Sequence, residues 1–174
     1  MIIGFDFDGT LVKSWTAEPL PGVRERLAAL PADTRTFIAT NQAGPVFRQM
    51  TGDAKYPTCE DVAQRIIGGL AALDWRPDAL FIATCAEKEP DYVWRIAAQE
   101  AMTKLYDLLN SVCYCLVSAV SFDRKPNAGM LFDAAGYFQI QPRHLLYIGD
   151  MPTDAQAAVA AGCRYQDAAD WRNE

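Results

Sequence analysis

The sequence predicts an α/β fold, a Rossmann-like, doubly wound parallel sheet with helices on both faces. Short apolar runs of strand length alternate with segments whose apolar residues recur at helical spacing, which is typical of parallel strands joined by helical crossovers. The first run, residues 1–7, is rich in Ile and Phe and stops at a Gly-Thr turn. A chain of 174 residues suits one domain with a substantial core. We therefore expect a single domain over residues 1–174.

The first half of the chain alternates predicted strands and helices. Pro21 and Gly22 open a helix that stops before Pro31. A loop rich in Gly, Pro and polar residues is expected to run to about residue 57. Thr58 can cap the next helix together with Asp61, and the buried stripe of that helix is expected to hold Val62, Ile66, Ile67 and Leu70. The strands predicted in this half cover residues 1–7, 35–39 and 79–83.

The second half continues the alternation. Its predicted helices cover residues 90–109, 127–137 and 153–161, and Gly162 ends the last of them. Its predicted strands cover residues 145–148 and 163–165. Residues 112–120 are apolar on every side, so their period fits a strand and a buried helix equally well.

Charge and composition restrict the classes of partner. The formal net charge is −6, which argues against sequence-independent binding of long nucleic acid. The longest apolar runs are far shorter than the roughly 20 residues that span a membrane, and no signal-type N-terminus is present. We expect a cytoplasmic protein without a membrane partner, whose five cysteines are buried thiols rather than disulfides. The sequence carries no pattern that sets an oligomeric state.

Two carboxylates, Asp6 and Asp8, end the first predicted strand. The carboxyl end of a central strand is where open α/β sheets bind ligands. Burying two carboxylates side by side is costly unless a cation or a proton neutralises one of them. A hard divalent ion, Mg²⁺, with a phosphate beside it explains the pair best, whereas an ordinary solvated turn is the alternative.

Four segments in chain order resemble the motifs of the haloacid-dehalogenase-like (HAD) phosphatases. They read D-F-D-G-T from Asp6, T-N-Q from Thr40, R-K-P-N-A-G-M from Arg124 and I-G-D-M-P-T-D from Ile148. The resemblance covers about residues 1 to 162. The second and third motifs are similar to those of the branch that holds histidinol-phosphate phosphatase, heptose-bisphosphate phosphatase and the phosphatase half of polynucleotide kinase/phosphatase.

The resemblance implies a role for each acidic residue. Asp6 would be the nucleophile that takes the phosphoryl group, and Asp8 would be the acid and base that offers the metal its backbone carbonyl. Asp150 would complete a Mg²⁺ site with Asp6. Asp154 would bind the metal through water or pair with Lys125, and its ordinary alternative is a favourable charge at a helix N-terminus.

The same resemblance implies the phosphate and substrate contacts. Thr40 and Asn41 would hold the phosphoryl oxygens, and Lys125 would neutralise the phosphate together with the nucleophile. Pro126 is expected to start a helix directly after this lysine. Arg124 would contact the substrate. The ordinary alternatives are a strand-end threonine, a surface Lys-Pro turn and an exposed arginine.

One departure from the branch concerns zinc and the covering segment. Several members bind zinc through cysteine and histidine, but Cys85, Cys113 and Cys115 have no fourth soft ligand here, so we expect no zinc site. The spacing from Asp8 to Thr40 leaves no room for a large cap. We therefore expect a family-atypical insertion around residues 85–123.

These observations predict a Mg²⁺-dependent phosphomonoester hydrolase with a small phosphorylated metabolite or nucleotide as substrate. A polynucleotide 3′-phosphatase is the second hypothesis, and the acidic charge counts against nucleic-acid ends as substrate. The third is a non-catalytic phosphate-binding or scaffold module. The complete set of Asp6, Asp8, Thr40, Lys125 and Asp150 counts against that one.

Overall fold

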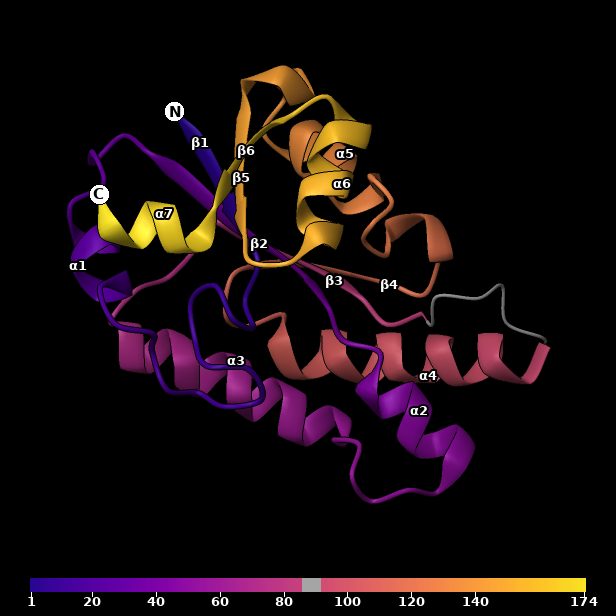
Figure 1. Ribbon diagram of the computed structural model, residues 1–174. Coiled ribbons are helices and arrows are strands. Elements are labelled where there is room, and N and C mark those ends of the chain that lie inside the picture. Colours follow the sequence, from indigo (N-terminus) through magenta and orange to yellow (C-terminus); the bar gives the residue numbers. More distant parts are fainter. Residues whose placement is uncertain (86–91) are drawn as a thin grey trace.

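The computed structural model describes residues 1–85 and 92–174, and within them one sheet of six parallel strands runs in the order β4-β3-β2-β1-β5-β6 (Figure 1). From β1 the chain builds outward to β4 on one side, and then crosses back to place β5 and β6 on the other side. This is the doubly wound α/β sheet that the sequence predicts. The strands are β1 (Ile2–Phe5), β2 (Arg35–Asn41), β3 (Ala79–Ala83), β4 (Tyr114–Ser118), β5 (Leu145–Gly149) and β6 (Arg164–Asp167).

Helices cover both faces of the sheet (Figure 1). On one face α3 and α4 pack over the strands, and on the other face α5 and α6 do so. None of the described helices is both long and apolar enough to cross a membrane. The helices are α1 (Val23–Ala28), α2 (Gly44–Thr51), α3 (Cys59–Leu73), α4 (Tyr92–Leu109), α5 (Gly129–Tyr137), α6 (Pro152–Ala161) and α7 (Ala168–Asn173), with 3₁₀ turns η1 (Ser121–Asp123) and η2 (Pro142–His144).

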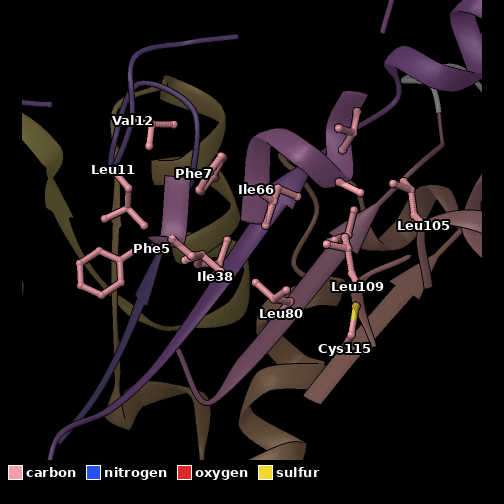
Figure 2. Packing of buried hydrophobic residues seen from close by; sticks show 14 of the residues in the cluster. Phe5, Phe7, Leu11, Val12, Ile38, Ile66, Leu80, Leu105, Leu109 and Cys115 are labelled. Atoms are coloured by element: carbon pink, nitrogen blue, oxygen red, sulfur yellow. The ribbon is translucent and has the colours of Figure 1, made fainter. Parts of the chain in front are cut away.

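The register of the parallel strands builds the larger core. Phe5, Ile38, Leu80 and Cys115 are neighbours across β1 to β4 and share the face that α3 and α4 cover (Figure 2). Phe5 is fully buried, and burying a side chain of this kind contributes roughly 1.5–3 kcal/mol to stability. This row of side chains anchors the end of β1, from which the first acidic residue follows directly.

Helix α3 begins with the predicted capping box. The Thr58 hydroxyl accepts a hydrogen bond from the Asp61 N–H, and the Asp61 carboxylate accepts one from the Thr58 N–H. The stripe prediction is wrong for Ile67, which is 42% exposed. Helical spacing from Val62 continues through positions 66, 70 and 73, so residue 67 points away from the sheet. The buried members of the stripe are Val62, Ile66 and Leu70.

Two other predictions are wrong. Residues 43–57 are not all loop, because Gly44–Thr51 forms α2, where Phe47 packs its ring against Tyr56 and Trp94. A proline near the first turn is compatible with a helix, and the apolar contacts with α4 are not visible in the local sequence. Helix α5 begins at Gly129 rather than at Pro126, so Lys125 does not sit on the first turn of a helix.

The open question over residues 112–120 is resolved as a strand. Tyr114–Ser118 is β4, which pairs with β3 at the edge of the sheet. The described part of the 85–123 segment therefore supplies α4 and β4. The atypical-insertion prediction stays a prediction, and it falls partly on residues 86–91, outside the described residues, as does the start of the helix predicted from residue 90.

Candidate functional site

The predicted site residues gather at the carboxyl ends of β1, β2 and β5. Strand β1 lies between β2 and β5, where the chain changes direction across the sheet. Open α/β sheets bind ligands at such a switch point. A cavity of about 280 Å³ opens there. The described residues that line it are Asp6, Asp8, Ser14, Trp15, Thr40, Asn41, Gln42, Ala43, Gly44, Lys125, Asp150, Met151, Thr153 and Asp154.

Asp6 follows β1 directly and is 7% exposed. Its N–H donates to the Ile148 carbonyl at 2.8 Å, so the pairing of β1 with β5 continues up to this residue. The Lys125 ammonium donates to Asp6 Oδ1 at 2.7 Å. Burial raises the pKa of Asp6 to about 6, with Lys125 opposing the rise and Asp154 adding to it.

Lys125 is buried among oxygen atoms. Its Nζ lies 2.7 Å from Asp6 Oδ1, 2.6 Å from Asp154 Oδ1 and 2.9 Å from the Tyr147 hydroxyl. Asn41 holds its backbone, since the amide nitrogen donates to the Lys125 carbonyl and the amide oxygen accepts from the Lys125 N–H, both at 3.0 Å. Burial alone would lower the pKa of Lys125, but Asp6, Tyr147 and Asp154 raise it well above its usual value. The side chain therefore keeps its positive charge.

Three carboxylates form the candidate metal centre. One oxygen each from Asp6, Asp150 and Asp154 lies within 4.8 Å of the other two. Among the described residues, buried Asp154 Oδ1 has no hydrogen-bond partner beyond its ion pair with Lys125. Burial raises the pKa of Asp150, and the nearby Asp154 adds to the rise. Three carboxylates exceed the charge of one ammonium, and their oxygens are the ligands that Mg²⁺ takes, so the residues fit this ion.

Two glycines allow the carboxylates to approach. Gly9 has φ +78°, and a Cβ atom there would lie 2.2 Å from Asp150 Oδ2. A Cβ atom on Gly149 would lie 2.5 Å from the Asp154 side chain. Any other residue at either position would displace a carboxylate of the candidate metal centre.

Asp8 lines the same cavity, but its carboxylate is bound elsewhere. Oδ1 accepts from the Trp15 N–H at 3.0 Å and pairs with Nη1 of Arg65 from α3, while Oδ2 accepts from Gln42 Nε2 at 2.9 Å. Sequence reasoning missed Arg65 and assigned Gln42 no role. An arginine on an amphipathic helix is ordinarily solvated, so no local signal marks Arg65.

The remaining predicted contacts divide into two groups. Thr40 is buried on the cavity, where its hydroxyl accepts from Gln42 Nε2 at 3.0 Å, and Asn41 lines the cavity while it binds the backbone of Lys125. Arg124 donates to the Cys85 carbonyl at 3.1 Å and is absent from the described residues that line the cavity. The structure thus brings the predicted residues together except Arg124, whose substrate contact stays a prediction.

Zinc ligation by the three cysteines would require thiolates. Burial raises the pKa of Cys113 to about 11 and that of Cys115 to about 12, and burial also raises the pKa of Cys85. Within residues 1–85 and 92–174, the cluster that could hold a metal ion consists of Asp6, Asp150 and Asp154, and no cysteine belongs to it. Burial thus favours the protonated form of these thiols, and the expectation that they hold no zinc stays a prediction.

Comparisons with known proteins agree with this architecture. The family model of the HAD-hydrolase-like proteins matches residues 122–165, which include the third motif from Arg124 onward and the fourth motif. The D,D-heptose 1,7-bisphosphate phosphatase of B. bronchiseptica, solved with magnesium and phosphate, superposes with a TM-score of 0.60 and 24% identity. The alignment covers 94% of this chain and 78% of that one. The chain has the HAD-like fold.

A second HAD-like neighbour extends the comparison. A Mesorhizobium loti protein named as a HAD-like phosphatase superposes with a TM-score of 0.51 and 18% identity, over 92% of this chain and 68% of that one. No curated protein sequence matches the chain. The resemblance that the motifs indicate is thus confirmed at the level of the HAD-like fold.

Proposed function

We propose that this HAD-like protein is a magnesium-dependent phosphomonoester hydrolase that acts on a small phosphorylated metabolite or nucleotide. One observation carries the proposal. Asp6 is buried 2.7 Å from the Lys125 ammonium and shares a cluster with Asp150 and Asp154, while Asp8 is held apart on the same cavity. Asp6, beside the cation and the candidate metal ligands, suits the nucleophile, and Asp8, which lies apart from that cluster, is left for proton transfer.

The metal would be held by residues already close together. Asp6 and Asp150 would bind Mg²⁺ with the backbone carbonyl of Asp8, and Asp154 would bind the ion through water or keep its pair with Lys125. When bound, Mg²⁺ offsets the negative charge of the phosphoryl group and of the carboxylates. Mg²⁺ suits this cluster because the cluster offers oxygen ligands and carries uncompensated negative charge.

The proposed chemistry has two steps. A carboxylate oxygen of Asp6 attacks phosphorus, the bond between phosphorus and the leaving oxygen breaks, and Asp8 donates a proton to that oxygen. The phosphoryl group is then bound to Asp6 as an acyl phosphate. Water attacks the phosphorus, Asp8 accepts the proton, and the bond from Asp6 to phosphorus breaks to release inorganic phosphate.

Lys125 and Thr40 would stabilise the transferring group. The ammonium of Lys125 lies against the nucleophile and would exchange one of its present partners for a phosphoryl oxygen, where developing negative charge needs a fixed cation. The Thr40 hydroxyl and the backbone N–H groups that follow it would donate to the other oxygens. Asn41 would contribute by its backbone, because its side chain holds Lys125 in place.

The size of the cavity and the net charge of the chain favour a small substrate. The cavity of about 280 Å³ is slightly smaller than the usual range for ligand sites, roughly 300–1,000 Å³. A net charge of −6 disfavours long nucleic acid. The structural likeness to a heptose-bisphosphate phosphatase supports including sugar phosphates among the candidates.

The test is a panel of phosphate esters with and without Mg²⁺. Sugar phosphates, nucleotides, 4-nitrophenyl phosphate and 3′-phosphorylated oligonucleotides are compared, with release of inorganic phosphate as the readout. D6N is expected to lower kcat at least about 10³-fold, because the nucleophile is lost. D33N, which changes an exposed aspartate outside the cavity lining, serves as the matched control.

Three other results of the phosphate-ester panel would contradict the proposal, each in a different way. Activity confined to the oligonucleotides would favour the 3′-phosphatase hypothesis. The absence of Mg²⁺-dependent hydrolysis across the whole panel would favour a non-catalytic phosphate-binding module. Undiminished activity of D6N would exclude Asp6 as the nucleophile.

A further inference from the structure

We propose that Arg65 is a positioning residue that, together with Gln42, holds the Asp8 carboxylate on the side of the cavity where the leaving oxygen departs. The inference rests on the proposed function. It adds α3, which the sequence motifs do not include, to the elements that build the active site.

The three side chains form a closed set of contacts. Arg65 Nη1 pairs with Asp8 Oδ1, and Arg65 Nη2 donates to Gln42 Oε1 at 2.6 Å. Gln42 Nε2 completes the set by donating to Asp8 Oδ2 at 2.9 Å. Each Asp8 oxygen thus has its own donor, so the direction of the carboxylate is defined.

Trp15 closes the outer side of this arrangement. Its backbone N–H donates to Asp8 Oδ1 at 3.0 Å, and its indole ring lies over the Arg65 guanidinium with 5.4 Å from Cζ to the ring centre. The Arg65 side chain is 9% exposed, whereas Trp15 itself is 70% exposed. The ring therefore covers the Arg65 side of the ion pair, whereas the Asp8 side chain is 24% exposed.

Trp15 also holds an unusual backbone conformation. It has φ +65°, which is uncommon for a residue with a bulky side chain. A strained residue persists where its surroundings determine it, and such residues gather at functional sites. Here the conformation directs the N–H to Asp8 and the ring to Arg65.

The positioning has a chemical reason. Without its contacts to Arg65 and Gln42, the Asp8 carboxylate would be drawn toward the positive charges on the other side of the cavity, which are Lys125 and any bound metal ion. Its proposed task requires an oxygen within hydrogen-bond reach of the leaving group instead. A displacement of about 1 Å from that place can lower a rate about 10²-fold.

Helix α3 does not need this ion pair in order to pack. Its buried stripe of Val62, Ile66 and Leu70 and its capping box already join it to the sheet. The direction of the Arg65 side chain toward the cavity is thus best explained by the chemistry of the cavity.

The test compares R65Q and R65K with R26Q, which removes an ion pair with Glu174 outside the cavity lining. The readout is kcat/KM for 4-nitrophenyl phosphate, which has a good leaving group, and for an alkyl phosphate, which has a poor one. Proton donation matters more for the poor leaving group. R65Q is therefore expected to lose about 10²-fold on the alkyl phosphate and much less on the aryl phosphate. R65K should recover part of the loss, and R26Q should match the wild type.

A double-mutant cycle with D8N shows whether R65Q acts through the position of Asp8 or by disturbing the structure in general. If Arg65 acts through Asp8, R65Q in the D8N background causes no further loss on the alkyl phosphate. Equal losses on both substrates, or losses that add to those of D8N, would overturn the inference and leave the proposed function standing. Wild-type protein that hydrolyses neither ester would overturn both. Circular dichroism checks folding, and if R65Q is unfolded, R65K carries the same comparison.

Discussion

Lys125 is 3% exposed, and two carboxylates and a phenol hydroxyl surround its ammonium group. Such an ion is tolerated in the interior because its partners are close and well directed. Removal of the cation alone would leave Asp6 and Asp154 buried and uncompensated. This lysine therefore contributes to stability as well as to the proposed chemistry.

We predict that K125M lowers the free energy of unfolding by about 3–5 kcal/mol, because a buried ion pair loses one partner. Urea denaturation of the metal-free protein measures the change. K55M is the matched control, since Lys55 forms an exposed pair with Asp53, and its urea midpoint should equal that of the wild type. A K125M protein as stable as the wild type would show that the buried carboxylates do not depend on this cation.

At the scale of elements, the site depends on how closely two loops approach. The turn after β1 and the loop after β5 meet where Gly9 faces Asp150. Strand β1 pairs with β2 on one side and with β5 on the other, so both loops start from rigid positions. The Asp150 carboxylate can come this close to the turn after β1 only because Gly9 has no side chain.

We predict that G9A weakens Mg²⁺ binding by about 10–100-fold, as changes next to metal ligands commonly do. Gly52 is the matched control, because it also has positive φ, +70°, but a Cβ atom added there would meet no described atom within 4 Å. Both variants should lose about 1–2 kcal/mol of stability through backbone strain. Titration calorimetry with Mg²⁺ distinguishes them, and equal affinities in G9A and G52A would contradict the steric argument.

At the scale of the whole molecule, the candidate metal centre is built from residues near opposite ends of the chain. Asp6 follows the first strand, whereas Asp150 follows β5 and Asp154 lies in the first turn of α6, on the last crossover of the sheet. The unfolded chain does not hold these carboxylates together. Metal binding should therefore stabilise the folded state, and the stabilisation should increase with the metal concentration.

The pH dependence of this stabilisation follows from Asp6. Its pKa rises from an ordinary 3.8 to about 6 in the folded protein, chiefly through burial. The folded state thus holds the proton more tightly than the unfolded chain. Without metal, the contribution of Asp6 to stability is greatest at acid pH and is lost as the pH rises through about 6. A metal ion reverses this preference, because it requires the carboxylate.

We predict that Mg²⁺ raises the melting temperature of the wild type at pH 8 and much less at pH 5, where Asp6 is mostly protonated. Once the site is saturated, each tenfold rise in Mg²⁺ should add about 1.4 kcal/mol to the free energy of unfolding at pH 8. Thermal melts across Mg²⁺ concentrations at both pH values measure this. D150N should abolish the effect, and an equal effect at the two pH values would contradict the role of Asp6.

Local patterns in the sequence predicted much of this molecule. Five of the six strand positions follow from short apolar runs, whereas residues 112–120 stayed open between strand and helix, and the capping box of α3 follows from Thr58 and Asp61. Strand ends that carry Asp6, Thr40 and Asp150 indicated the site, since parallel strands present their carboxyl ends at one edge. These features depend on neighbouring residues or on a repeating period, so the sequence alone determines them.

Tertiary structure decided the remainder. Arg65 reaches Asp8, Asn41 holds the backbone of Lys125, and Tyr147 in β5 places a hydroxyl beside the ammonium. Each contact joins residues far apart in the chain, and none has a spacing that a local pattern could reveal. Helix α2 likewise depends on packing against α4. Propensity and periodicity describe neighbours along the chain, whereas charge compensation and side-chain direction depend on which segments the folded sheet brings together.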